Sequence, residues 1–206
     1  MKLYKFKSLE GDGLLHSLDM IVNKRIYLST CDFMNDPYEG SWYQKESLSL
    51  LCNSDADDYT KQAVELYSIV KKTKFTCFTK CFKNTLLWAH YAGGFTGVCF
   101  EFELSKKKHD IRDIDYSRKD GKPVISIADI EKVLKKSVKP QDIGILRSKA
   151  NCWVYEEEYR IFSNNNYIEA KPTRIIFGKM NYNNIFHGIA EKYDIQISFL
   201  DFANGK

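Results

Sequence analysis

An alternation of side chains over residues 98–104 constrains the fold of this chain more than any other feature. Phe100 and Phe102 are apolar, and Glu101 and Glu103 interleave with them. Alternation with a period of two is typical of a β-strand, in which successive side chains point to opposite faces. We therefore expect a strand here, with both phenylalanines in the core and Glu101 on the other face.

The other apolar patterns predict short elements that do not follow a regular βα repeat. Helical spacing of apolar residues predicts helices over 14–22, 57–72, 86–91 and 185–193, with helical patches near 127–137 and 140–150. Runs of β-forming residues predict strands at 3–6, 25–29, 75–79, 158–162, 174–177 and 195–200. This order predicts an α+β fold with a mixed, largely antiparallel sheet and flanking helices. We expect a single domain over 1–206, because no linker or repeat divides the chain.

Composition is that of an ordinary soluble globular protein. Hydrophobic residues make up 44% and charged residues 28%, which excludes an intrinsically disordered chain. No apolar run approaches the roughly 20 residues of a membrane-spanning helix, and the first residues lack the pattern of a signal peptide. We therefore expect a cytoplasmic protein with no membrane partner. The net charge of +4 permits contact with nucleic acid or nucleotide phosphates without requiring it.

The six cysteines are expected to be reduced thiols, because no secretion signal points to an oxidising compartment. Cys77 and Cys81, followed by His90, have the spacing of half a zinc site. No second pair of ligands follows, and Phe78 and Phe82 favour a buried strand instead. We therefore expect no metal.

Familiar catalytic motifs are absent, and three clusters remain as candidate sites. The sequence has no phosphate-binding GxxxxGK[ST] loop, GxGxxG, HExxH, GxSxG or paired CxxC. The first cluster, residues 35–39 (NDPYE), is either a capped turn or part of a site. The second, residues 88–91 (WAHY), is either a core-facing aromatic stripe or a wall that stacks on a base or a nicotinamide ring.

The third cluster is the charged and aromatic segment 153–160 (WVYEEEYR). We expect it to be a strand, on which Glu156, Glu158 and Arg160 point the same way because side chains alternate. Two carboxylates and a guanidinium are costly to bury, so this face is either an ion-paired surface or the lining of a polar site. The spacing alone does not decide between the two.

Six segments taken together carry a resemblance. They are residues 3–6, 25–29, 33–39, 87–91, 97–102 and 153–161. Their order and spacing resemble a bacterial family of unknown function that is similar to the abortive-infection AbiGi group. The resemblance implies a phage-defence or toxin-like effector that acts on an unknown macromolecular target or a phage protein.

Tyr4 and Lys5 in the first strand, Ser29 at the end of the second, and Glu156-x-Glu158 in a late strand carry a more distant resemblance to ADP-ribosyltransferases. It implies a split sheet, NAD as cofactor and transfer of ADP-ribose to a protein or nucleic acid. Glu158 would be the catalytic carboxylate and Glu156 its partner on the acceptor side. Arg160 would orient them or contact phosphate. The binding cleft would be formed by Tyr4, Lys5, Ser29, Asn35, Asp36, Trp88, His90 and Tyr91.

Two alternatives stay open. One is a non-catalytic module that senses a nucleotide, a nucleic acid or a phage protein, with residues 88–91 as the recognition wall. The other is a metal-dependent nuclease using Asp36, Glu101, Glu156 and Glu158, although their spacing matches no known nuclease motif. A cleft that contains both late glutamates with Asn35 and Trp88 favours an enzyme, whereas glutamates that face open solvent favour the binding module.

Overall fold

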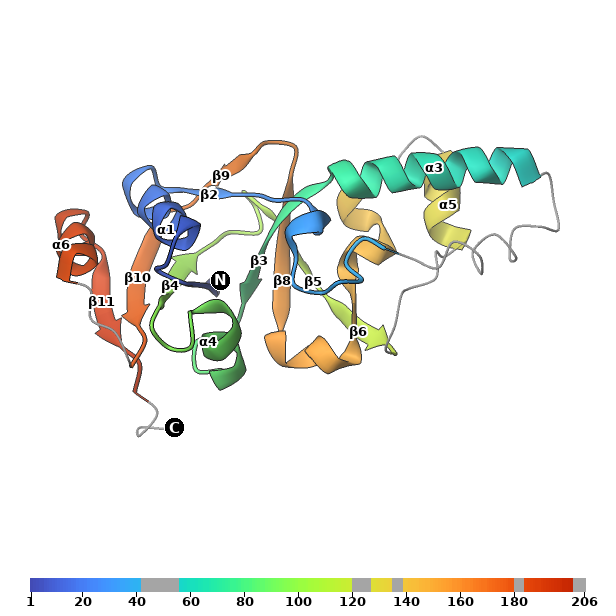
Figure 1. Ribbon diagram of the computed structural model, residues 1–206. Coiled ribbons are helices and arrows are strands. Elements are labelled where there is room, and N and C mark those ends of the chain that lie inside the picture. Colours follow the sequence, from blue (N-terminus) through green and yellow to red (C-terminus); the bar gives the residue numbers. More distant parts are fainter. Residues whose placement is uncertain (42–55, 120–126, 135–138, 180–183, 202–206) are drawn as a thin grey trace.

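A seven-stranded sheet forms the centre of the structure, a computed structural model that describes residues 1–41, 56–119, 127–134, 139–179 and 184–201 (Figure 1). Its strands lie in the order β11-β10-β4-β1-β3-β8-β5. Neighbours are antiparallel except β10 and β11, which are parallel. In chain order the strands are β1 (Lys2–Lys7), β3 (Lys74–Thr79), β4 (Val98–Glu103), β5 (Asp110–Asp113), β8 (Glu158–Ser163), β10 (Pro172–Phe177) and β11 (Gln196–Phe199). The expected α+β class with a mixed, largely antiparallel sheet is confirmed.

Two small sheets and a set of helices surround the central sheet. The small sheets pair β2 (Arg25–Tyr27) with β9 (Tyr167–Glu169), and β6 (Asp115–Arg118) with β7 (Ser148–Ala150). The α-helices are α1 (Asp12–Val22), α3 (Ala56–Lys72), α4 (Thr85–Tyr91), α5 (Ile127–Leu134) and α6 (Asn184–Lys192). Short 3-10 helices are η1 (Cys31–Phe33), η2 (Pro140–Asp142), η3 (Gly144–Arg147) and η4 (Asn151–Glu156). In the part of the chain with described coordinates, no helix is long and apolar enough to span a membrane.

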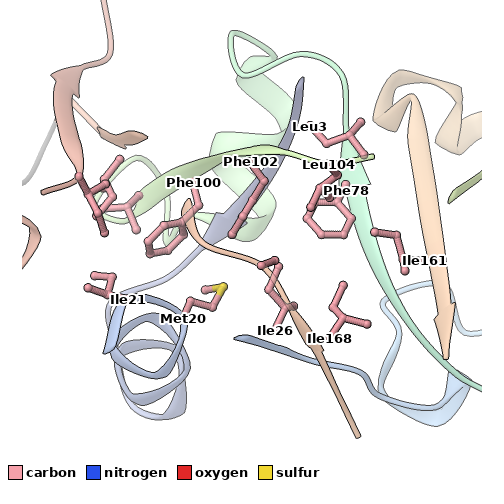
Figure 2. Close-up of a cluster of buried hydrophobic side chains, with 14 of the residues drawn as sticks. Leu3, Met20, Ile21, Ile26, Phe78, Phe100, Phe102, Leu104, Ile161 and Ile168 are labelled. Carbon is pink, nitrogen blue, oxygen red and sulfur yellow. The ribbon is translucent and has the colours of Figure 1, made fainter. Parts of the chain in front are cut away.

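Strand β4 is buried on both faces, which refines the prediction from its alternation. Phe100 and Phe102 lie in the core as expected, in one cluster with Met20 and Ile21 of α1 (Figure 2). Phe186 of α6 packs on Phe100 in the same cluster. Glu101 lies on the other face, but that face is also covered, and its exposed fraction is only 4%. The Glu101 carboxylate accepts a hydrogen bond from the Tyr4 hydroxyl at 3.1 Å and lies 3.2 Å from the Lys2 amino group. These partners compensate the cost of burying its charge.

Strands β1 and β3 are joined much more loosely than β1 and β4. The pairing of β1 with β4 runs from Lys2 to Lys7, whereas β1 and β3 share only the pair Tyr4–Thr79. Beyond that pair, the Lys5 amino group donates hydrogen bonds to the Thr76 hydroxyl at 2.8 Å and to the carbonyl of residue 77 at 3.0 Å. A side chain therefore spans the two strands where backbone pairing stops.

Local patterns predicted most elements correctly, and the differences lie in polar segments. The charged stretch after Leu104 contains β5 and β6, and residues 140–150 form two 3-10 helices and β7 rather than a helical patch. The segment 153–160 is not one strand: η4 ends at Glu156, and β8 begins at Glu158. Glu157 between them adopts a left-handed conformation, with φ of 42°, which interrupts the extended backbone. Residues 135–137 of the predicted patch near 127–137 lie outside the described residues.

No disulfide joins the cysteines of the described residues. Cys31, Cys77, Cys81 and Cys99 are free thiols. Cys52 lies outside the described residues. Cys77 is on β3, as the flanking phenylalanines indicated, whereas Cys81 follows the end of that strand.

Candidate functional site

A pocket of about 520 Å³ lies beside the loose junction of β1 and β3. Its volume falls within the roughly 300–1,000 Å³ typical of small-molecule sites. Side chains from β1, α1, β3, the end of α4 and the η4–β8 corner line it. Seven of the predicted site residues meet here: Tyr4, Lys5, Ser29, Asn35, Tyr91, Glu156 and Glu158. Segments far apart in the sequence therefore converge on one pocket.

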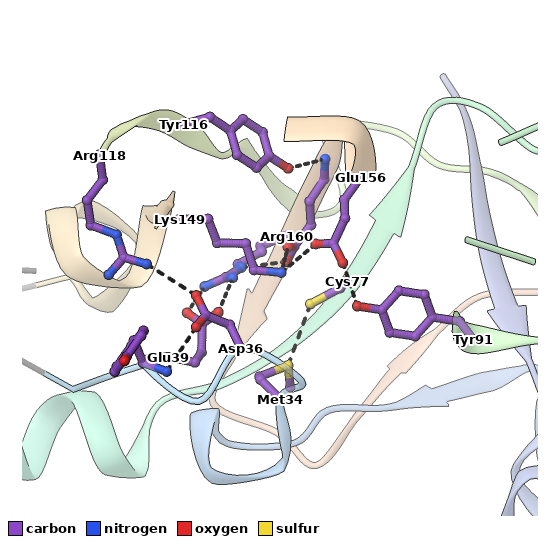
Figure 3. A network of polar contacts seen from close by, with 12 residues as sticks. Met34, Asp36, Glu39, Cys77, Tyr91, Tyr116, Arg118, Lys149, Glu156 and Arg160 are labelled. Carbon is purple, nitrogen blue, oxygen red and sulfur yellow. Dashed lines mark hydrogen bonds and ion pairs between the residues drawn. The ribbon is translucent and has the colours of Figure 1, made fainter. Parts of the chain in front are cut away.

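Lys149 joins the two carboxylates of the pocket, and Figure 3 shows its contact with Glu156. Its amino group lies 2.5 Å from an oxygen of Glu156 and 2.6 Å from an oxygen of Glu158. The second oxygen of Glu156 accepts a hydrogen bond from the Tyr91 hydroxyl. Glu156 thus reaches the site from the end of η4, although it does not share a strand with Glu158.

Arg160 is completely buried and does not line the pocket itself. Its guanidinium donates to Glu158 at 2.7 Å, to both oxygens of Glu39 at 2.7 and 2.8 Å, and to the carbonyl of Leu146 at 2.7 Å. It also lies 4.5 Å from the ring centre of Phe75. The expected alternation of Glu158 and Arg160 is confirmed, and Arg160 orients Glu158. Its alternative role as a direct phosphate contact is wrong, because the guanidinium is enclosed and already bound.

The environments of the two pocket carboxylates push their pKa values apart. Burial raises the pKa of Glu156, and the attraction of Lys149 does not fully offset this. Burial also acts to raise the pKa of Glu158, but Arg160 and Lys149 outweigh it, so the net pKa lies below the usual value. Glu158 is therefore ionised at neutral pH. A divergence of this kind is typical of an acid–base pair.

The loop that carries residues 35–39 is fixed by two buried carboxylates. Asp36 accepts a hydrogen bond from the backbone N–H of Tyr38 at 2.9 Å and pairs with Arg118 at 3.2 Å. Glu39 makes the bidentate contact with Arg160. Asn35 alone of these three lines the pocket. Asp36 therefore stabilises the loop from outside the pocket, contrary to its expected place in the cleft.

Residues 88–91 divide between the core and the pocket. Trp88 is fully buried, its indole N–H donates to the carbonyl of Phe82 at 2.6 Å, and its ring packs edge-on against Phe6. The expected role of Trp88 as a stacking wall is therefore wrong, because its indole ring packs against core residues and is closed to a ligand. His90 is exposed and lies outside the pocket lining. From this cluster, Tyr91 lines the pocket.

The β1 side of the pocket is basic. Lys5 and Lys7 both line it, together with His16 from α1. Burial lowers the pKa of Lys5. Burial, with the positive charge of Lys5 second, lowers the pKa of Lys7 to about 7. The pocket thus has a basic side on β1 and an acidic side at the η4–β8 corner.

The sequence analysis missed four residues that the site uses: Glu39, Lys149, Lys7 and His16. His16 lies on the helix expected over 14–22, and no motif marked it. Glu39 belongs to the segment that was singled out, but nothing marked it as the partner of Arg160. Lys149 lies in a stretch with no recognisable motif. Lys7 shares a strand face with Lys5, and the alternation of β1 could have indicated it.

The four carboxylates proposed for a nuclease are not gathered as metal ligands. Each forms an ion pair with a nearby lysine or arginine side chain. Asp36 pairs with Arg118, Glu101 with Lys2 and Arg174, and Glu156 and Glu158 with Lys149. Among the residues with described positions, no three His, Cys, Asp or Glu side chains are placed to hold a metal ion. The geometry therefore gives the nuclease alternative no support.

Comparison with known proteins finds a family match for one part of the chain. Residues 87–161 match a family described as "Protein of unknown function (DUF2971)". This region contains Tyr91, Lys149, Glu156, Glu158 and Arg160. It excludes β1 and Glu39. No curated protein and no solved structure matches the chain.

Proposed function

We propose that this chain is a phage-defence or toxin-like effector that binds NAD in the β1–β3 pocket and transfers ADP-ribose to a macromolecular target. The observation that supports this proposal is the meeting of an ionised Glu158 and a Glu156 of raised pKa in a ligand-sized pocket. Tyr4, Lys5 and Ser29, which carried the resemblance to ADP-ribosyltransferases, line the same pocket.

The two carboxylates suit the two halves of such a transfer. When the bond between nicotinamide and ribose breaks, nicotinamide leaves with the bonding electrons and positive charge develops at the ribose carbon. An ionised carboxylate beside the ribose stabilises that charge. The acceptor then bonds to the same carbon and loses a proton, for which the Glu156 carboxylate is the base. Glu158 takes the first role because Arg160 and Lys149 keep it ionised.

Arg160 and Glu39 act as positioning residues in this proposal. Neither lines the pocket. Arg160 fixes one oxygen of Glu158, and Glu39 fixes Arg160 through two hydrogen bonds. A carboxylate held in this way is ready for the developing charge without further reorganisation.

The test measures release of nicotinamide from NAD, together with transfer of label from NAD to proteins and nucleic acids of a bacterial lysate. We expect release by the wild-type chain, and a fall of about 100-fold or more in Glu158→Gln, the size typical of losing one preorganised electrostatic contact. Glu103→Gln is the matched control, because Glu103 is an exposed carboxylate on β4. Absence of release by the wild type, or equal release by Glu158→Gln, would refute the proposal.

A non-catalytic nucleotide sensor is the second candidate, and the burial of Glu158 favours it. This side chain is only 4% exposed, and Arg160 and Lys149 already pair with its oxygens. Such a carboxylate can shape a pocket without contacting a reacting atom. Binding of NAD without release of nicotinamide would support the sensor and exclude the transferase.

A further inference from the structure

We propose that Lys7, with Lys5 and His16, forms a subsite for a phosphate group of a nucleotide on the β1 side of the pocket. The inference rests on the proposed nucleotide ligand but not on its cleavage. It concerns three basic groups from β1 and α1 that line the same pocket as the carboxylates.

The geometry of β1 places the two amines side by side. Lys5 and Lys7 are two residues apart on one strand, so they point to the same face with an α-carbon spacing of about 6.6 Å. The Lys5 amino group donates to Thr76 and to the backbone of Cys77, which leaves one of its three N–H groups for a ligand. The backbone of Lys7 pairs with β4, but its amino group makes no hydrogen bond or ion pair with any residue whose position is described. The N–H donors of the Lys7 amino group are therefore available to a ligand.

The charges around Lys7 favour an anion. The titratable groups on this side are Lys5, Asp12, His16, Asp19, Tyr27, which stacks on His16, and the Cys77 thiol. Asp19 is occupied by Arg25, with its oxygens 3.0–3.1 Å from the guanidinium. Asp12 remains as an acidic neighbour of His16. Burial and the charge of Lys7 lower the pKa of His16, so its imidazole is a neutral hydrogen-bond donor at neutral pH. Two amines and this imidazole thus share the side with one carboxylate that has no ion pair among the described residues.

The mutual repulsion of the lysines supports a phosphate between them. Burial lowers the pKa of Lys7, and the charge of Lys5 lowers it further. A bound anion offsets both effects, because it returns hydrogen bonds to the desolvated amine and lies between two positive charges. Lys5 interacts electrostatically with Glu158, so it connects the phosphate subsite to the carboxylates. Lys7 and Glu158 line the same pocket, so a nucleotide with its phosphate at Lys7 has its ribose in the pocket that contains Glu158.

The test compares ADP with adenosine as probes, by isothermal titration calorimetry at fixed salt. We expect wild type to bind ADP more tightly than adenosine. Lys7→Met should weaken ADP binding by about tenfold or more, as expected for the loss of a charge-assisted hydrogen bond, and should leave adenosine binding within about twofold. Lys7→Arg should retain ADP binding, because it keeps the charge. Lys107→Met is the control, since Lys107 is an exposed lysine outside the pocket.

Thermal melting of each variant shows whether it is folded. Equal binding of ADP and adenosine by wild type, or unchanged ADP binding by folded Lys7→Met, would overturn the phosphate subsite. Nicotinamide release is scored separately, so the two proposals can fail separately. Lys7-dependent ADP binding without nicotinamide release upholds the subsite and refutes the transferase. Nicotinamide release, together with ADP binding that does not depend on Lys7, upholds the transferase and refutes the subsite.

Discussion

Substitution of Glu39 by glutamine tests whether the buried charge network stabilises the fold. Glu39 is 5% exposed, and its carboxylate accepts two hydrogen bonds from the fully buried Arg160. Glutamine has nearly the same shape but places an NH₂ group against one of the guanidinium donors. The variant therefore loses one charge and one of the two hydrogen bonds, and it introduces two donors that face each other.

The expected loss follows from these contacts. Removing one partner of a buried ion pair costs about 3–5 kcal/mol. The retained hydrogen bond contributes about 1 kcal/mol, and Arg160 keeps Glu158 as a second counter-charge at 2.7 Å. We therefore expect a fall of about 2–3 kcal/mol in the free energy of unfolding. For a chain of this length, that corresponds to a Tm lower by roughly 4–12 °C.

Thermal melting followed by circular dichroism, supported by urea titration, measures this loss. Glu103→Gln serves as the control, because it removes an exposed carboxylate from β4, and we expect its Tm to change by less than about 1 °C. If Glu39→Gln melts within about 1 °C of wild type, the network contributes little to folding and our account of Arg160 is wrong.

Two further predictions concern the pH dependence of stability and the aromatic core. Burial alone would raise the pKa of Glu158, but Arg160 and Lys149 lower it overall. The ionised carboxylate therefore stabilises the folded chain above the pKa of an unfolded glutamate, near 4.3, and this stabilisation is lost as pH falls below that value. We expect the Tm of Glu158→Gln to fall less steeply than that of Glu103→Gln between pH 5 and about 3, and equal slopes would contradict this. Trp88→Ala should lower the free energy of unfolding by about 3–5 kcal/mol, because it removes a fully buried side chain; urea titration measures this, and a loss below about 1 kcal/mol would argue against a core role.

The sequence alone determined most of the regular elements, because local spacing reports which face of an element is apolar. The alternation around Phe100 predicted β4, and helical spacing predicted α1, α3, α4 and α6. It could not show that Glu101 is buried, since that depends on partners from β1 and β10. Short polar strands such as β5 were missed, because their pairing with β8 comes from the sheet and not from their own pattern.

The same division holds for the candidate site. The proximity of Glu158 and Arg160 was predictable from strand periodicity, because it requires only two alternating positions on one strand. The position of Glu156 was not, since the left-handed backbone at Glu157 ends η4 and Lys149 draws the two carboxylates together. Whether a charged face lies in water or in the interior depends on what packs over it. Only the tertiary structure brought Glu39 to Arg160 across 121 positions of sequence, and that contact compensates the burial of the guanidinium.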